Sequence, residues 1–222
     1  MSTEVRASAL TLVGLVVFGV LLFGPAGTFG YWQGWVFLAV VILSAALPSV
    51  YVFRAQPATL ERRMQVGQEN RAAQRVAVVL LLASFAGAMV LGGFDHRFGW
   101  SSVPVAVVLL GDVLVAVGMV LSIVVVAQNE YAAANVTVEG RQEVVSTGLY
   151  AIVRHPMYAV SLLATVGMPL ALGSWWAMWF VVPAASALVI RIRDEERLLL
   201  QELAGYRDYV HEVRSRLIPF VW

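Results

Sequence analysis

Long apolar runs constrain this chain more than any other feature of its sequence. Stretches of about 20 apolar residues recur along it, which is the length of α-helix that crosses the roughly 30 Å hydrocarbon core of a bilayer. Only 13% of its 222 residues are charged, whereas a soluble domain carries about 25%. The sequence therefore predicts an integral membrane protein whose fold class is all-α.

The apolar runs predict five to six membrane segments. They lie at residues 8–24, 31–53, 76–93, 103–127, 157–172 and 175–191. The last two segments come from one uncharged run, Met157 to Ile190, which is too long for a single ordinary span at 1.5 Å per residue. Within that run Pro169 removes a backbone donor, and Gly173-Ser174 can turn. We therefore expect a polytopic transmembrane helix bundle that ends in a tight C-terminal helical hairpin.

The distribution of arginine supports the hairpin. In the six-segment arrangement, every arginine except Arg97 falls on one side of the membrane. Cytoplasmic loops carry an excess of basic residues, so the sequence predicts a multi-pass protein with both termini and the active site in the cytoplasm. A single final span would instead place the arginine-rich tail outside. The first segment also resembles a signal peptide, but cleavage would remove a helix that this alternation needs.

Composition excludes several kinds of chemistry. The chain has no cysteine, so disulfides, thiolate metal sites and a cysteine nucleophile are absent. Its net charge of +1 argues against a nucleic-acid partner, as does the tail, in which acidic residues balance the arginines. No histidines and carboxylates have metal-ligand spacing, so we expect no metal site. The loop at 54–75 looks amphipathic, which favours an interfacial helix over a cofactor lid.

Two polar clusters are expected to face each other across the hairpin. Because a hairpin returns the chain to the side that it left, Arg154-His155 at its start and Glu195-Glu196 past its end lie at the same surface. Each cluster also has a simpler explanation, since "RIRDEERLLL" can be a cytoplasmic stop signal and Pro156 is ordinary at a helix start. Together, the clusters suggest a pocket for a small zwitterion.

The spacing of these residues resembles a known family of membrane enzymes, the isoprenylcysteine carboxyl methyltransferases, which are related to phospholipid N-methyltransferases. The family pattern is T-G-x-Y-x-x-x-R-H-P-x-Y, a hydrophobic hairpin, R-x-x-x-E-E-x-x-L, G-x-x-Y-x-x-Y and I-P. The G-x-x-Y spacing is compressed in this chain, where Gly205 directly precedes Tyr206. The chain matches it between Gln128 and Trp222, with Val160 where the family usually has glycine. The matching residues are Thr147, Gly148, Tyr150, Arg154, His155, Pro156, Tyr158, Arg191, Glu195, Glu196, Leu199, Gly205, Tyr206, Tyr209, Ile218 and Pro219.

The resemblance implies that S-adenosylmethionine is the methyl donor. It divides the chain into N-terminal transmembrane helices at 1–127 and a catalytic region at 128–222. An arginine or a histidine N–H suits the cofactor's carboxylate, a glutamate suits its ammonium or ribose hydroxyls, and tyrosines suit its adenine or sulfonium. The implied cofactor-binding residues are Gly148, Tyr150, Arg154, His155, Pro156, Tyr158, Glu195 and Glu196.

The resemblance also implies a lipophilic methyl acceptor that enters sideways from the bilayer among membrane lipids. A carboxylate acceptor needs positioning but no base, and Arg191 or Arg193 can hold it. Glu195 becomes important as a base or charge partner if the acceptor is an amine. The implied catalytic residues are thus Arg191, Arg193 and Glu195, and the implied substrate-binding residues are Asn129 and Arg191. Whether the acceptor is an isoprenylated protein, a lipid, a quinone-like compound or a small hydrophobic acid stays open.

Two other functions are compatible with the sequence. NADPH-dependent membrane sterol reductases carry a similar R-x-P-x-Y element, but they commonly continue with glycine and an acidic residue where this chain has Ala159-Val160. A small transporter or membrane assembly protein is the non-enzymatic alternative, although transporters often show repeated halves and none is visible here.

Asp112 lies within the fourth segment, where we expect it to snorkel or to make a polar bond to another helix.

Overall fold

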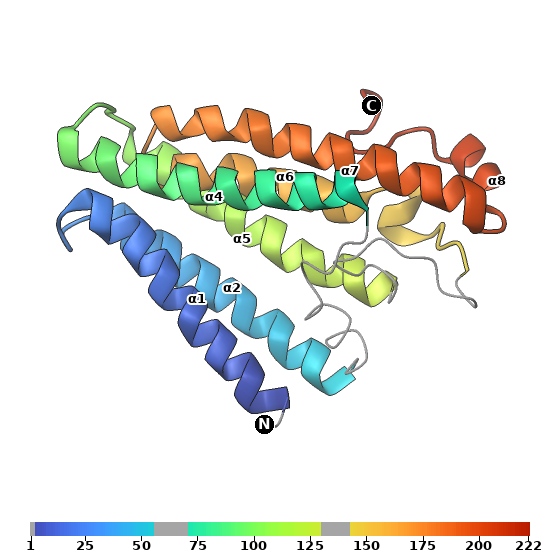
Figure 1. The fold of residues 1–222 in the computed structure, drawn as a ribbon, viewed down its shortest axis with the longest axis horizontal. Coiled ribbons are helices and arrows are strands. Elements are labelled where there is room, and N and C mark those ends of the chain that lie inside the picture. The colour runs from blue at the N-terminus through green and yellow to red at the C-terminus, as the bar shows by residue number, and fades with distance from the viewer. Residues whose placement is uncertain (1–2, 56–70, 130–142) are drawn as a thin grey trace.

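The computed structural model describes the backbone of residues 3–55, 71–129 and 143–222 and the side chains of 13–45, 71–129 and 143–222. The expected interfacial helix at 54–75 lies largely outside the described residues. The elements are α1 (Thr3–Ala26), α2 (Trp32–Ala55), α4 (Ala72–Phe98), α5 (Val105–Gln128), η1 (Gly148–Ala151), α6 (Pro156–Ala171), η2 (Trp176–Phe180), α7 (Val181–Glu202) and α8 (Tyr206–Glu212) (Figure 1).

The all-α fold is confirmed for the described residues, and a helix covers each of the six predicted segments. A helix can also extend beyond its apolar residues: α7 continues from Arg191 to Glu202. Arginine, leucine and glutamate are good helix formers, so a helix need not end where its apolar stretch ends. The described helices long and apolar enough to cross a membrane are Ala72–Phe98, Val105–Gln128 and Trp176–Glu202. The shorter apolar stretches are Val13–Ala26, Trp32–Ala45 and Pro156–Ala171, so six spans remain a prediction.

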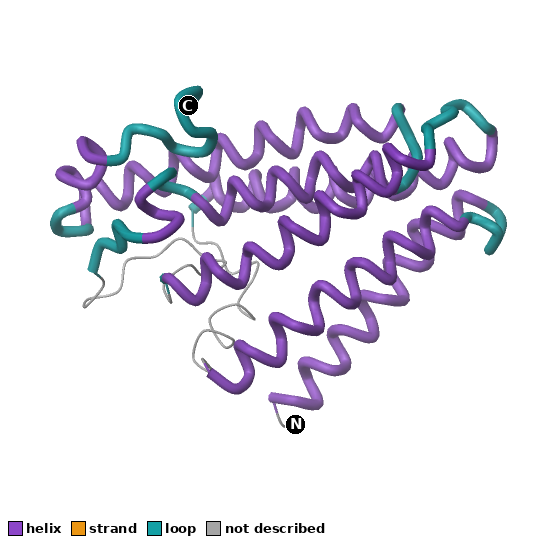
Figure 2. Tube along the Cα trace, turned by 180° about the vertical axis from the view of Figure 1, so that it is seen from behind, coloured by secondary structure: helices purple, strands orange, loops and turns teal. Residues whose placement is uncertain are grey.

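Helices α4, α5, α6 and α7 form an elongated bundle, and α1 and α2 are an antiparallel pair that splays away from it (Figures 1 and 2). Helix α5 packs along α6 and α4 along α7, while α1 contacts α4 and α2 contacts α5. The predicted hairpin is confirmed: α6 and α7 run antiparallel, and the chain turns back between Leu172 and Trp175. This arrangement brings the start of α6 and the end of α7 to one end of the bundle.

The closest helix contact, between α5 and α6, depends on glycine. A Cβ on Gly111 would lie 2.3 Å from the Ala171 nitrogen, and one on Gly118 would lie 2.7 Å from the Val160 carbonyl oxygen. On the facing helix, a Cβ on Gly167 would lie 2.7 Å from the Gly111 carbonyl oxygen. Small residues let membrane helices approach closely. Val160, which stands where the family usually has glycine, therefore lies in a close contact in which the glycine is Gly118 of α5.

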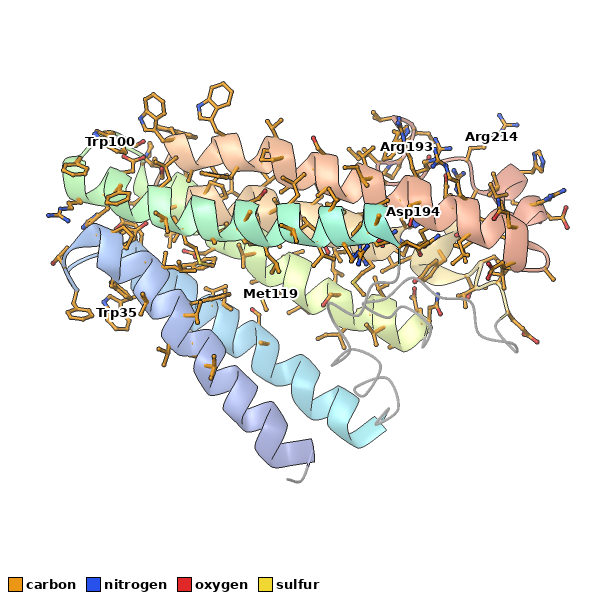
Figure 3. All side chains as sticks on the ribbon, viewed as in Figure 1. Trp35, Trp100, Met119, Arg193, Asp194 and Arg214 are labelled. Atoms are coloured by element: carbon orange, nitrogen blue, oxygen red, sulfur yellow. The ribbon has the colours of Figure 1, made fainter. Side chains whose placement is uncertain are left out.

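A polar network fixes the hairpin turn at the end of the bundle where Trp35 and Trp100 lie (Figure 3). Asp95 is 2% exposed, and it accepts hydrogen bonds from the Ser101 amide at 2.6 Å and from the hydroxyls of Ser101 and Ser174. Gly173, with φ of 67°, makes the turn beside it. The predicted break at Gly173-Ser174 is thus confirmed and stabilised by a buried carboxylate.

Asp112 behaves differently from Asp95. It is only 5% exposed, so it does not snorkel, and neither of its carboxylate oxygens has a hydrogen-bond partner among the described residues. The expected polar bond to another helix is therefore wrong for the described part of the chain. Asp112 directly follows Gly111, which lies in the tight α5–α6 contact.

Replacing Asp112 with leucine is expected to stabilise the protein by about 1–3 kcal/mol, because it removes an unpartnered buried polar group. Leucine keeps the branching at Cγ. The matched control is Asp95→Leu, which should destabilise by a similar amount because it strips a hydrogen-bonded carboxylate from Ser101 and Ser174. Thermal unfolding of both variants in detergent measures the difference. Equal destabilisation by the two substitutions would contradict the assignment for Asp112.

Candidate active site

The hairpin joins the two predicted polar clusters at a buried carboxylate. The Arg154 guanidinium donates to Glu196 Oε1 from Nε at 2.8 Å and lies 2.7 Å from it at Nη2. His155 Nε2 lies 3.4 Å from the same oxygen. Arg154, His155 and Glu196 are 6%, 4% and 6% exposed. The prediction that these residues face each other across the hairpin is confirmed.

A C-terminal strap, residues 213–222, closes over this cluster. Arg216 Nε donates to Glu196 Oε2 at 2.7 Å, so both carboxylate oxygens are bound. Arg154 Nη1 donates to the carbonyls of Val213 at 2.7 Å and Arg214 at 2.9 Å. The backbone amides of Arg154 and His155 also donate to the strap, at the Ser215 and Arg216 carbonyls. The strap is therefore fixed by the R-H-P motif itself.

These contacts tie two of the residues expected to bind the cofactor to other parts of the chain. Every nitrogen of the Arg154 guanidinium donates to Glu196 or to the strap. Glu196 is held by Arg154 and Arg216, with His155 beside it. Removing one member of such a buried group leaves the others uncompensated. Arg154 and Glu196 thus form the structural centre of the site.

A second group lies on the neighbouring side of α7. The Tyr158 hydroxyl donates to Glu195 Oε2 at 2.7 Å and accepts from Arg191 Nε at 3.3 Å. Arg191 and Glu195 are one helical turn apart, so their side chains share a face. The Arg191 guanidinium carbon also lies 5.9 Å from the centre of the Tyr158 ring. Opposite charges on α7 are therefore connected through one hydroxyl on α6.

The loop before α6 is shaped by Gly148 and Gln128. Gly148 has φ of 62°, and a Cβ there would lie 2.4 Å from Gln128 Nε2. The Leu149 amide donates to Gln128 Oε1 at 2.9 Å. Glycine is required at this position by its left-handed backbone and by the close side chain. Asn129 follows Gln128 directly, at the end of α5.

The start of α6 follows helix-start rules without using the histidine side chain. Pro156 occupies the first turn, where its missing N–H is harmless. His155 is the N-cap residue, but its side chain makes no capping hydrogen bond. The side chain of His155 therefore does not cap the helix. Its ring lies 5.7 Å from the ring of Tyr158, which places it at the junction of the two groups.

Helix α8 covers the loop from outside. Tyr209 donates from its hydroxyl to the Tyr150 carbonyl at 2.7 Å, which joins α8 to η1. Tyr206 and Tyr209 are both buried, and burial raises the pKa of each hydroxyl above its usual range. The nearby carboxylates of Glu196 and Glu195 raise the pKa of Tyr206 further. Both hydroxyls therefore stay protonated at neutral pH.

Arg193 lies outside this arrangement. It is exposed and makes no hydrogen bond or ion pair with the described residues of the cluster. Asp194, on another side of α7, faces α4 instead, where Gln74 Nε2 donates to it at 2.7 Å and Arg71 pairs with it at 3.0 Å. Figure 3 shows Arg193 and Asp194 on different sides of α7, at the same end of the bundle as Arg214.

Comparison with known proteins identifies the chemistry. Residues 106–206 match the family model described as phospholipid methyltransferase. A search of the curated proteins found no match to the chain. Members of the matched family are S-adenosylmethionine-dependent methyltransferases, and the protein is an enzyme of this class that uses S-adenosylmethionine.

The segment that is similar to the phospholipid methyltransferase family thus lies in an all-α bundle with several apolar helices. The match favours the methyltransferase over the sterol-type reductase and the transporter. The matched segment runs from α5 to the first residue of α8, so it includes Arg154, Tyr158 and Glu196. The strap lies beyond it. Arg216 had no part in the sequence pattern, and only the structure identifies it as a partner of Glu196.

Proposed function

We propose that the protein methylates the carboxylate of a lipophilic acceptor, as the isoprenylcysteine carboxyl methyltransferases do. The observation that carries this proposal is the Arg191–Tyr158–Glu195 group at the end of a helix long and apolar enough to cross a membrane. Arg191 in this group provides a permanent cation at the point where α7 passes from apolar to charged residues. The polar end of an acceptor that lies in the bilayer would reach the membrane surface at this point.

The residues present fit S-adenosylmethionine. His155 Nε2 is buried and has no hydrogen-bond partner within the described chain, although Glu196 lies 3.4 Å away. Glu195 accepts from Tyr158 and lies beside a cation and aromatic rings. We assign Gly148, Tyr150, His155, Pro156, Tyr158 and Glu195 to the cofactor's surroundings, with Arg154 and Glu196 positioning them. The cofactor supplies a methyl group on a sulfonium, which is attracted to aromatic faces.

In this proposal Arg191 orients the acceptor carboxylate, and Asn129 contacts it from the end of α5. Arg193, which is exposed, contributes charge at the surface. A carboxylate is already a nucleophile, so the residues must align it and exclude water rather than remove a proton. We further propose that residues 1–127 form the membrane scaffold and 128–222 the catalytic region. Both termini and the site then lie in the cytoplasm, as the arginine distribution predicts.

A phospholipid amine is the second candidate acceptor. The description of the matched family favours it, since that family is named for phospholipids. In that case Glu195 accepts the proton of the acceptor ammonium, and Tyr158 holds the Glu195 carboxylate in place. The two candidates differ in the bond that is formed, which is the O–C bond of a methyl ester for a carboxylate acceptor and an N–C bond for an amine acceptor.

Transfer of a tritiated methyl group distinguishes them. Purified protein in phosphatidylcholine vesicles is supplied with labelled S-adenosylmethionine and either an S-prenylated N-acetylcysteine or phosphatidylethanolamine. A methyl ester releases volatile methanol in base, whereas an N-methyl group stays with the lipid. Base-labile label on the prenylated acid supports the proposal. Base-stable label on phosphatidylethanolamine alone would replace it with amine methylation, and no transfer to either would overturn both acceptors.

A further inference from the structure

A buried tyrosine hydroxyl beside the site has no partner in the described part of the chain. Tyr206 is 4% exposed, and its Oη makes no hydrogen bond to any described residue. Tyr209, three residues later on the same short helix, donates to the Tyr150 carbonyl at 2.7 Å. Buried polar groups in native proteins are nearly always hydrogen-bonded, so an unpartnered one calls for a specific explanation.

The position of Tyr206 is fixed by its surroundings. Gly205, with φ of 79°, makes the turn that starts α8. The Tyr206 ring packs with Leu199, Tyr209 and Val213, and its centre lies 5.6 Å from that of Tyr209. The hydroxyl is therefore held in place by apolar packing and by the bond of Tyr209 to η1. It does not need a hydrogen bond of its own to stay there.

The charges around Tyr206 are those of the site. Burial first, and then the carboxylates of Glu196 and Glu195, raise the pKa of its hydroxyl, while Arg154 lowers it. His155 Nε2 is a second buried atom that lacks a hydrogen-bond partner among the described residues, and it lies beside the same Glu196. Tyr206 packs in one cluster with Leu199, which lies one helical turn after Glu195, so the unpartnered atoms on the α6 start and on α8 both lie near the charged end of α7. This is the pattern expected where a polar ligand completes the hydrogen bonds.

We infer that the Tyr206 hydroxyl binds a hydrogen-bond donor of S-adenosylmethionine, either its ammonium group or its ribose hydroxyls. The inference rests on the cofactor site proposed above and adds to it a residue from α8. Two nearby carboxylates favour a cationic or hydroxyl donor over the cofactor's carboxylate. A tyrosine oxygen accepts such a bond, and its own proton remains for a second one.

The test compares Tyr206→Phe with Tyr209→Phe. Calorimetry measures binding of S-adenosylhomocysteine, and thermal unfolding without ligand measures stability. We expect Tyr206→Phe to weaken binding about tenfold, which is the value of one hydrogen bond, with unfolding unchanged or shifted to higher temperature. Tyr209→Phe should instead lower the unfolding temperature, because it breaks the bond to Tyr150. A second titration with 5′-methylthioadenosine, which lacks the amino-acid part, locates the contact.

A loss for both ligands places the contact on the ribose, and a loss for S-adenosylhomocysteine alone places it on the ammonium; each supports the inference. Unchanged affinity in Tyr206→Phe would overturn it. Destabilisation of that variant to the level of Tyr209→Phe would also overturn it, because the hydroxyl would then serve the fold. If the wild-type protein bound neither ligand, the proposed cofactor site itself would be wrong. This outcome differs from a failure of the Tyr206 inference alone, in which the wild-type protein still binds.

Discussion

Replacing Glu196 with glutamine is expected to lower the free energy of unfolding by about 3–5 kcal/mol and to abolish cofactor binding. Glu196 holds the guanidinium groups of Arg154 and Arg216 on its two oxygens. A glutamine keeps the shape but loses the charge and one acceptor, so two arginines would remain uncompensated. Because Arg154 also holds the strap, the effect should spread to the end of the chain.

Chemical unfolding in detergent, read from tryptophan fluorescence, measures this loss. Trp222 is a local reporter, since the Arg216 guanidinium carbon lies 5.4 Å from the centre of its ring. Glu202→Gln is the control, because Glu202 is an exposed glutamate near the end of the same helix. A Glu196→Gln variant as stable as Glu202→Gln would show that the carboxylate is not the structural centre of the site.

Replacing Tyr158 with phenylalanine is expected to lower kcat about 100-fold while the protein stays folded. The hydroxyl joins Glu195 at 2.7 Å to Arg191 at 3.3 Å, so its loss removes a contact that positions both charged side chains. Small displacements of positioning groups have rate effects of this size. Binding of S-adenosylhomocysteine should change much less than kcat, because the ring of Tyr158 remains.

A double-mutant cycle with Glu195→Gln tests the coupling. Since both substitutions remove the same hydrogen bond, the double variant should lose little more than the worse single variant. Ser161→Ala is the control for loss of a hydroxyl from α6, because Ser161 donates only within that helix, to the Met157 carbonyl at 2.8 Å. Additive losses, or full activity of Tyr158→Phe, would show that the Arg191–Tyr158–Glu195 group does not act as a unit.

The hairpin and its consequence could be predicted because they depend on local chemistry. Gly173 and Ser174 interrupt a run that is too long for one span, and the arginines require an even number of crossings before the tail. Once the chain turns there, Arg154 and Glu196 must meet. Their separation of 42 positions in the sequence is therefore no obstacle to predicting the contact.

The strap could not be predicted, because its bonds use backbone atoms. Arg154 binds the carbonyls of Val213 and Arg214, and any residue presents the same carbonyl. For the same reason the sequence could not show that Arg154 binds the strap. The contact of Gln128 could not be predicted either, because its partner is the backbone amide of Leu149. The glycines at 111 and 118, seven residues apart on one helix face, were a usable signal of close helix packing.

Asp95 and Asp112 show where sequence patterns stop being informative. Asp112 lies within the predicted segment at 103–127, Asp95 lies just past the predicted segment at 76–93, and both are buried. Asp95 lies near a helix end, where the turn residues Ser101 and Ser174 reach it. Asp112 lies within α5, next to Gly111 in the close α5–α6 contact, and its oxygens have no partner among the described residues. The difference depends on tertiary packing and not on the residues adjacent in the sequence.

Calorimetric titration of S-adenosylhomocysteine into the detergent-purified protein tests the central claim most directly. The account predicts micromolar binding to the wild-type protein, at least tenfold weaker binding to His155→Ala, and unchanged binding to His211→Ala, in which an exposed histidine of α8 is replaced. Equal affinity of His155→Ala and the wild-type protein would contradict the claim, because the cofactor would then bind away from the cluster formed by the α6 start and the end of α7.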